Sequence, residues 1–280
     1  MSSIDLYNEV SVECSKKLTN RYSTSFSSGI RLFDRNIRNH IYSIYGFVRV
    51  ADEIVDTFHD YDKEELFKNF RKSVEFDFEK GISANPIINS YIKVCNLFNI
   101  PYEYTDAFLD SMEMDLYHTQ FTKTLYNKYI YGSAEVIGLM CLKVFCQGDE
   151  MRFNELKNTA QKLGSAFQKI NFLRDLDSDQ CERGRIYFPN LPDTKSLANV
   201  KIQIEKEIEE EFNLAYDGVL ALPDNSRLGV YVAYKYYSSL LKKIQKSDAN
   251  KVQNSRIRIS DFRKFFILTT SLAKHQLNFV

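Results

Sequence analysis

The chain has few of the residues that interrupt helices. Its 280 residues include only 10 glycines and 5 prolines, and no stretch alternates apolar and polar residues for long enough to predict a β-strand. Apolar patterns with a helical period run between the few breaks, and no linker rich in serine, glycine or proline divides them. We therefore predict an all-α fold in a single domain that covers residues 1–280.

Several classes of function need features that the chain lacks. Lysine plus arginine and aspartate plus glutamate both number 37, so there is no net charge and no basic stripe for nucleic acid. The 5 cysteines include no C-x-x-C, which favours reduced thiols over a zinc site or a disulfide framework. The motifs G-x-G-x-x-G, G-x-x-x-x-G-K-[ST] and G-x-S-x-G are absent too. No nucleic-acid partner is expected.

No apolar run is long enough to cross a membrane. The longest, from Val136 to Phe145, is broken by Lys143 and falls short of the roughly 20 residues that a spanning helix needs. The first ten residues contain acids and no apolar core of a secretory signal. We expect a soluble, cytoplasmic protein. Peripheral contact with a membrane is a hypothesis, and the oligomeric state is left open.

Periodicity, caps and prolines place the helices. They are predicted at Ser2 to Thr19, Asp34 to Thr57, Tyr61 to Lys80, Asn85 to Phe98, Tyr102 to Thr119, Leu125 to Gln147, Leu163 to Asp179, Ser196 to Ala221, Asn225 to Lys246 and Ser260 to Phe279. Arg21 to Phe33 is predicted as a loop or broken helix, and Gln180 to Thr194 as a loop. The polar run from Ser247 to Ser255 separates the last two helices.

A polar stripe follows the predicted helix from Leu163. Helical spacings of 4, 3, 4 and 4 place five residues along one line: Gly164, Gln168, Asn171, Asp175 and Asp179. Apolar residues form a neighbouring stripe suited to packing: Leu163, Phe167, Ile170, Leu173 and Leu176. Such a helix is either a solvated surface helix or the wall of a wet cavity.

A second stripe of the same design lies more than a hundred residues earlier. Asp34 is the predicted N-cap of its helix, whose apolar face comprises Ile37, Ile41, Ile44, Val48, Ala51 and Val55. Beside that face the spacings 4, 3 and 4 align Tyr45, Arg49, Asp52 and Asp56. Later in the chain, a cluster of small residues allows a helix or a ligand to approach closely: Gly132, Ser133, Ala134 and Gly138.

A single D-x-x-x-D is weak evidence of a site, because Asp106 and Asp110 have the same spacing and are expected on a solvated face. The two stripes differ because each also carries polar groups that are costly to bury unpaired. Two carboxylate pairs that face each other across a buried cavity repel unless cations lie between them. Hard oxygen ligands of this kind suit Mg²⁺, and Mn²⁺ could replace it.

Phosphate-binding donors occur near the ends of both helices. They are Arg49, Arg174, Arg183, Arg185, Ser23, Ser25 and Tyr187. The chain also has 18 tyrosines and 21 phenylalanines, which supply aromatic faces for a carbocation in a water-poor pocket. Together the residues predict a site for Mg²⁺ and a diphosphate ester inside an apolar helical bundle.

These segments give the chain a resemblance to the squalene/phytoene synthase family of head-to-head prenyltransferases. The matching motifs are STSF from Ser23, IYSIYGFVRVADEIVD from Ile41, YGSAEVIGLM from Tyr131, FQKINFLRDLDSDQCERGRIYFP from Phe167, and RIRISDFRK near the C-terminus. They occur in order over nearly the whole chain. The resemblance implies an isoprenoid-synthase helical bundle with a central cavity.

The resemblance also implies roles for residues. The implied Mg²⁺ ligands are Asp52, Asp56, Asn171, Asp175 and Asp179. The implied contacts to substrate are Ser23, Ser25, Phe26, Arg49, Arg185 and Tyr187, while Tyr45, Gln168 and Asn171 join the four aspartates as catalytic residues. Glu53 stands where many members have a second aspartate, so its role stays open. Compared with the family pattern, one extra residue lies between Asp179 and Arg185, so it stays open which role belongs to Arg183 and which to Arg185.

The implied activity is the head-to-head condensation of two geranylgeranyl diphosphates to phytoene, through a cyclopropyl (prephytoene) diphosphate, in carotenoid biosynthesis. The segment RGRIYFP, from Arg183 to Pro189, is typical of the phytoene branch. Synthesis of squalene or dehydrosqualene from two farnesyl diphosphates is the alternative. A third hypothesis is a helical assembly factor that kept the fold and lost the chemistry, although both acidic pairs are intact.

Overall fold

The computed structural model describes residues 2–189 and 197–277, and of residues 24 and 25 it describes the backbone alone. These residues form helices, with no strand beyond an isolated bridge between Gln120 and Ile186. The all-α prediction is confirmed. The helices are α1 Ser3–Tyr22, α2 Thr24–Ile30, α3 Arg35–Asp56, α4 Lys63–Lys80, α5 Pro86–Leu97, α6 Tyr102–Tyr117, α7 Lys123–Ile130, the π-helical turn η1 Tyr131–Glu135, α8 Val136–Cys146, α9 Glu150–Cys181, α10 Leu197–Leu220, α11 Asp224–Gln245, α12 Ala249–Asn254 and α13 Asp261–Gln276.

The N-terminal prediction needs two corrections. Helix α1 continues past Thr19 to Tyr22, and the predicted broken segment contains the short helix α2, which Ser23 caps by accepting from the Phe26 N–H at 3.2 Å. Asp34 does precede α3, but its side chain makes no capping hydrogen bond. Packing of the apolar face, rather than this cap, therefore holds the start of α3.

Helix α9 is much longer than the predicted segment, with 32 residues from Glu150 to Cys181. Its start is capped by Asp149, whose side chain accepts from the Arg152 N–H at 2.9 Å. The loop predicted from Gln180 therefore begins only after the helix ends, and its residues 190–194 lie outside the described residues. The polar run from Ser247 to Ser255 lies between α11 and α13 as predicted, and it contains the short helix α12.

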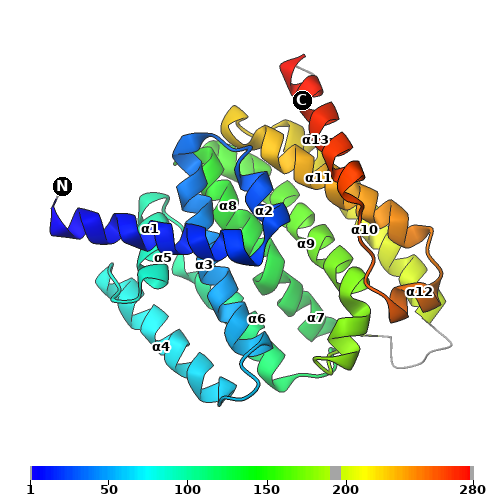
Figure 1. Cartoon of the computed structure of the whole chain (residues 1–280), viewed down its shortest axis with the longest axis horizontal. Coiled ribbons are helices and arrows are strands. Elements are labelled where there is room, and N and C mark those ends of the chain that lie inside the picture. The colour runs from blue at the N-terminus through cyan, green and yellow to red at the C-terminus, as the bar shows by residue number, and fades with distance from the viewer. Residues whose placement is uncertain (1, 190–196, 278–280) are drawn as a thin grey trace.

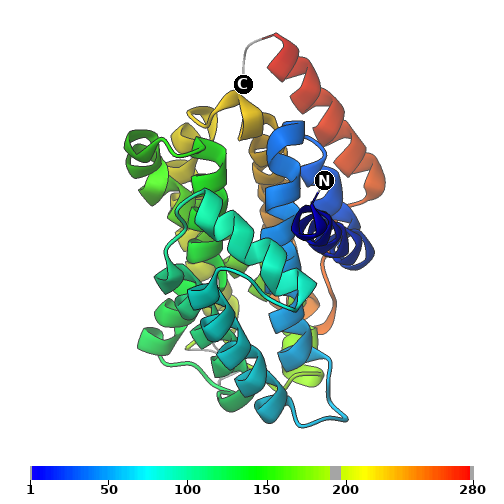
Figure 2. The same ribbon diagram turned by 90° about the vertical axis from the view of Figure 1, so that its left-hand side faces the viewer.

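The two stripe-bearing helices each organise one part of the core. Of the predicted apolar face of α3, only Val48 is not fully buried. Phe47 on the same helix stacks on Tyr91 of α5, with ring centroids 4.0 Å apart. Ile170, Leu173 and Leu176 of α9 are buried in the second hydrophobic cluster, which α10 and α11 share. Figures 1 and 2 show α9 inside the bundle and α13 on its outside.

The small residues predicted within Leu125 to Gln147 allow helices to pack closely. The segment is one helical run interrupted by η1. A Cβ added at Gly132 would lie 2.0 Å from the Ala107 carbonyl oxygen of α6, and one at Gly164 of α9 would lie 2.7 Å from that of Ala134. Backbone atoms occupy both positions, so glycine is required there. The sequence allowed either a helix or a ligand to approach these small residues, and the structure shows helices at Gly132 and Gly164.

The prediction that no apolar run is long enough to cross a membrane is wrong by length and composition, because this run is long and apolar enough among the described residues. It extends from Lys123 to Cys146, and 61% of its most apolar window is buried inside the protein. Burial of that extent is usual for the core helix of a bundle.

Candidate functional site

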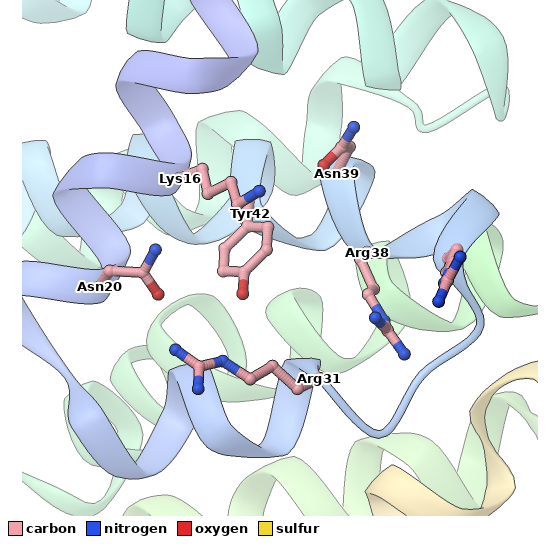
Figure 3. Close-up of a pocket in the computed structure, with 7 residues that line it drawn as sticks. Lys16, Asn20, Arg31, Arg38, Asn39 and Tyr42 are labelled. Atoms are coloured by element: carbon pink, nitrogen blue, oxygen red, sulfur yellow. The ribbon is translucent and has the colours of Figure 1, made fainter.

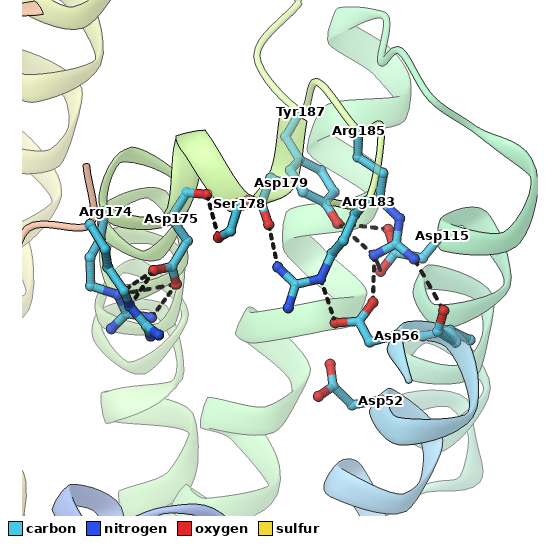
Figure 4. Close-up of polar contacts among 12 residues, drawn as sticks. Asp52, Asp56, Asp115, Arg174, Asp175, Ser178, Asp179, Arg183, Arg185 and Tyr187 are labelled. Carbon is cyan, nitrogen blue, oxygen red and sulfur yellow. Dashed lines mark hydrogen bonds and ion pairs between the residues drawn. The ribbon is translucent and has the colours of Figure 1, made fainter. Parts of the chain in front are cut away.

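The two acidic pairs lie close together at the ends of α3 and α9, joined by arginines (Figure 4). Arg185, in the segment that follows α9, places Nη1 2.6 Å from Oδ1 of Asp56. Arg183 bridges the helices, with Nε 3.2 Å from Asp56 and Nη1 2.7 Å from Asp179. The backbone N–H of Arg185 donates to the Asp179 carbonyl at 2.8 Å, which turns the chain back toward α3. Both arginines therefore pair with the acidic residues: Arg183 bridges Asp56 and Asp179, whereas Arg185 pairs with Asp56.

Asp52 lies one turn before Asp56 and is paired within its own helix. Arg49 Nη1 lies 2.6 Å from Asp52 Oδ2, and the same guanidinium pairs with the buried Glu53 and covers the Tyr22 ring at 4.6 Å. Burial, and next the negative charge of Asp56, raise the pKa of Asp52 to about 6. Glu53 pairs with Arg49, so it is placed to orient that guanidinium.

The α9 pair has arginines of its own. Asp175 accepts from Nε of its neighbour Arg174 at 3.0 Å and from Nε of Arg256 at 2.8 Å. Arg256 belongs to the segment between α12 and α13 and is half exposed. Burial raises the pKa of Asp179 to about 6, against the opposing effect of Arg183. Every carboxylate of the two pairs therefore has a guanidinium partner.

A fifth carboxylate, not predicted from the sequence, lies beneath the arginines. Asp115 of α6 is 9% exposed and accepts hydrogen bonds from the hydroxyls of Tyr129, at 2.7 Å, and Tyr187, at 2.9 Å. Its Oδ2 is 3.6 Å from Nη1 of Arg185. Burial raises the pKa of Asp115 to about 7. The sequence does contain an indication of this residue. Asp115 follows Phe108 by seven positions and Met112 by three, so helix geometry places it on an apolar face.

Gln168 and Asn171 continue the α9 stripe toward the middle of the helix. The Asn171 side-chain NH₂ donates to the Gln168 carbonyl at 3.3 Å, and the Tyr237 hydroxyl of α11 donates to Asn171 Oδ1 at 3.2 Å. Tyr237 stacks on Phe167, with centroids 4.1 Å apart, and burial raises its pKa. The amide of Asn171 is thereby held beside an aromatic wall.

The predicted substrate contacts near the N-terminus form a separate group. Phe26 of α2 stacks on Tyr45 of α3 with centroids 4.4 Å apart, and it is 42% exposed. Burial raises the pKa of Tyr45, while a hydrogen bond from the Ser23 side chain opposes this rise. The side chain of Ser25 lies outside the described residues. Tyr45 connects this group to Arg49, one turn further along α3.

The chemistry of the acidic groups suits a hard divalent cation, because the two pairs supply carboxylate oxygens from two helices. Among the described residues, no three of histidine, cysteine, aspartate and glutamate lie close enough together to hold a metal ion as they stand. Guanidinium groups supply the positive charge between the pairs. A cation and a diphosphate would need these arginines to turn from carboxylate to phosphate.

The solvated D-x-x-x-D pair behaves as the sequence predicts. Asp106 and Asp110 of α6 accept from one guanidinium, that of Arg71 on α4, at 2.6 and 2.7 Å. Glu113 and Lys128 complete a partly exposed surface network. The same D-x-x-x-D spacing therefore contributes to the arginine-linked site in α3 and α9, but to a surface network in α6.

Comparison with known proteins gives one family throughout. The sequence model of the squalene/phytoene synthase family matches residues 19–263. A 4,4′-diapophytoene synthase of Staphylococcus haemolyticus is 22% identical, over 91% of this chain and 94% of its own length. A phytoene synthase of Arthrospira platensis is 26% identical, over 92% and 91%. A solved dehydrosqualene synthase, in complex with a ligand, superposes with a TM-score of 0.78 at 19% identity, over 96% of this chain and 98% of that one.

Proposed function

Because this chain belongs to the squalene/phytoene synthase family, whose members are prenyltransferase-type enzymes that bind prenyl diphosphates, we propose that it joins two geranylgeranyl diphosphates head to head. The product proposed is phytoene, made through a cyclopropyl (prephytoene) diphosphate. The supporting observation is that α3 and α9 bring their acidic pairs to one place, where Arg183 bridges Asp56 and Asp179.

Arginines and tyrosines are proposed to bind the diphosphate groups. Arg185 and Tyr187 lie side by side at the end of α9, where the Arg185 Nη1–H donates to the Tyr187 hydroxyl at 3.4 Å. Guanidinium groups bind phosphate oxygens in pairs, and a phenol adds one more donor. Arg49 provides a second cation at the α3 side. Arg49, Arg185 and Tyr187, which lie beside the acidic pairs, would thus bind the diphosphate groups.

Aromatic side chains are proposed to protect the carbocation. Tyr45 with Phe26, and Tyr237 with Phe167, form stacked pairs beside the two polar stripes. Aromatic faces stabilise a cation through the ring quadrupole and keep water away from it. The amides of Gln168 and Asn171 lie next to the second pair, where they can orient the reacting carbons.

The proposed cofactor is Mg²⁺, or Mn²⁺ in its place. Asp52, Asp56, Asn171, Asp175 and Asp179 would hold it, since they offer oxygen ligands of the right hardness. The bound cation would neutralise the departing diphosphate.

Product analysis tests this function. The full-length protein is incubated with Mg²⁺ and geranylgeranyl or farnesyl diphosphate, and hydrocarbons are identified by mass spectrometry. Phytoene from geranylgeranyl diphosphate is expected. The alternative, a C30 synthase, is favoured by the similarity to 4,4′-diapophytoene synthase over nearly the whole chain. A C30 hydrocarbon from farnesyl diphosphate alone would replace the C40 assignment, and a matching incubation with NADPH would detect squalene.

The proposed location is the cytoplasm, with peripheral contact to a membrane that receives the hydrocarbon. Flotation with phosphatidylcholine vesicles tests this contact. Protein that stays at the bottom of the gradient with and without prenyl diphosphate would rule it out.

A further inference from the structure

A polar cavity lies at the start of α3, which ends at the acidic pair Asp52 and Asp56 (Figure 3 shows the cavity). It has a volume of about 430 Å³ and is lined by Lys16 and Asn20 of α1, Arg31 after α2, and Arg35, Arg38, Asn39 and Tyr42 of α3. Ten residues of α3 separate Tyr42 from Asp52, which is about 15 Å along a helix axis. The cavity shares no residue with the site described above.

The lining is strongly one-sided in charge. It contains four cationic side chains and no carboxylate, and among residues 2–189 and 197–277 none of the four forms an ion pair. Arg185 near the acidic pairs, by contrast, is paired with Asp56. Lys16, Arg31 and Arg35 are exposed and Arg38 is half-buried, so water only partly screens their repulsion and an anion bound between them would relieve it.

The floor of the cavity carries polar groups without partners. Tyr42 is 3% exposed, and its hydroxyl points into the cavity and makes no hydrogen bond with the described residues (Figure 3). The buried Oδ1 of Asn20 is also without a partner. Turning the Asn20 amide by half a rotation would place its NH₂ there as a donor. An unpartnered hydroxyl on a buried ring that faces a cavity is free to bond a polar ligand there.

One arginine is fixed in advance. Arg38 donates from Nε to the Phe33 carbonyl at 2.6 Å, which orients its guanidinium and leaves the terminal NH₂ groups for a ligand. The start of α3 adds its positive dipole end beside Arg35 and Arg38. A planar guanidinium that is oriented in advance binds phosphate oxygens at a lower entropic cost.

We propose that this cavity is a metal-independent binding site for a phosphate-type anion, either a diphosphate or a phosphomonoester. Its donors are Lys16, Arg31, Arg35 and Arg38, with the Tyr42 hydroxyl at the floor. The lining offers no carboxylate to hold Mg²⁺, in contrast to the acidic pairs, so its cationic side chains would neutralise the anion. The proposal does not rest on the proposed function.

The position of the site gives it influence over α2. Its residues come from α1 just before this helix and from Arg31, Arg35 and Arg38 just after it. A bound anion would tie these flanking segments together and fix the helix between them. Helix α2 carries Phe26, which stacks on Tyr45 in the candidate active site. Occupancy of the cavity would thereby stabilise one wall of that site.

A tryptophan reporter tests the proposal, because the chain contains no tryptophan. Asn39→Trp places an indole at the exposed rim of the cavity, and Phe76→Trp on α4 serves as a remote control. Both proteins are titrated in EDTA with inorganic diphosphate, and then with phosphatidylcholine vesicles with and without phosphatidic acid. The vesicles distinguish a lipid headgroup from a soluble phosphate.

Saturable emission change in Asn39→Trp alone is expected. Adding Arg31→Gln with Arg35→Gln should weaken binding by about tenfold or more, as two charge-assisted contacts are lost. The same charge change on α4, Lys68→Gln with Lys72→Gln, should leave it unaltered. Tyr42→Phe should weaken binding by about threefold. No response to diphosphate or to either vesicle, or a response that survives the Arg31/Arg35 change, would overturn the proposal. Circular dichroism confirms that each variant is helical.

Discussion

The acidic pairs of α3 and α9 have the same spacing but different support. Asp56 of α3 depends on Arg183 and Arg185, which are 127 and 129 residues away in the chain. Asp175 of α9 is held by the adjacent Arg174 and by the half-exposed Arg256. Asp56 is therefore supported by tertiary contacts above the buried Asp115, while Asp175 is supported in part by its own helix. The other two members, Asp52 and Asp179, have partners three and four residues away. Asp56 should be the more sensitive to loss of a partner.

Neutralising an aspartate in either pair should have the largest effect. Asp52→Asn and Asp175→Asn should each lower turnover by about 10³-fold, since both carboxylates are proposed to hold the charge of the diphosphate site. Asp106→Asn, from the surface pair with the same spacing, is the matched control and should retain activity. Rates are measured by product formation, and helix content by circular dichroism. Full activity in both variants would overturn the metal-ligand assignment, whereas a wild type that forms no product would favour the non-catalytic hypothesis.

The sequence was sufficient to predict which polar residues share a face of each helix, but not which residues of different helices contact each other. Spacings of three and four place Asp52 with Asp56, and Asp175 with Asp179, on single faces, and this follows from helix geometry alone. Asp115 was missed because no other acidic residue lies three or four positions before it in α6, so it does not form a D-x-x-x-D pair. Its partners, Tyr129, Tyr187 and Arg185, come from distant segments.

Helix boundaries show the same limit. The π-helical turn at Tyr131–Glu135 and the whole length of α9 depend on tertiary packing, which local propensity does not encode. The resemblance to a family indicated which polar stripe residues belong to one site, whereas periodicity alone also allowed a solvated helix.

Removing an arginine from each pair tests the difference in support directly. Arg185→Gln leaves the buried Asp115 without its cation and Asp56 with Arg183 alone, and should reduce the free energy of unfolding by about 3 kcal/mol at pH 8. Arg256→Gln removes a half-exposed ion pair and should cost at most about 1 kcal/mol. Denaturant unfolding in EDTA measures both. Equal losses would show that the two pairs are supported alike.

Asp115 should make stability depend on pH. Burial raises its pKa to about 7, so the folded protein retains a proton that the unfolded chain loses near pH 4. The stability from this proton is present below about pH 4 and is lost as pH rises through about 7. Between pH 5 and 8, wild type should therefore lose about 2 kcal/mol relative to Asp115→Asn. Parallel curves for the two proteins, measured by urea unfolding, would contradict the buried, proton-retaining carboxyl.

The smallest effect is expected where α9 receives its one hydroxyl contact from α11. Tyr237→Phe removes the donor to Asn171 Oδ1 but keeps the ring stacked on Phe167, so the free energy of unfolding should fall by about 1 kcal/mol. Turnover should fall a few-fold, because the Asn171 amide loses its orientation. Tyr236→Phe, on the same helix, is the control: its hydroxyl makes no hydrogen bond with the described residues, and it should match wild type within about 0.5 kcal/mol. If both variants unfold alike and turn over alike, the hydroxyl does not position Asn171, and α9 orients its amide through helix packing alone.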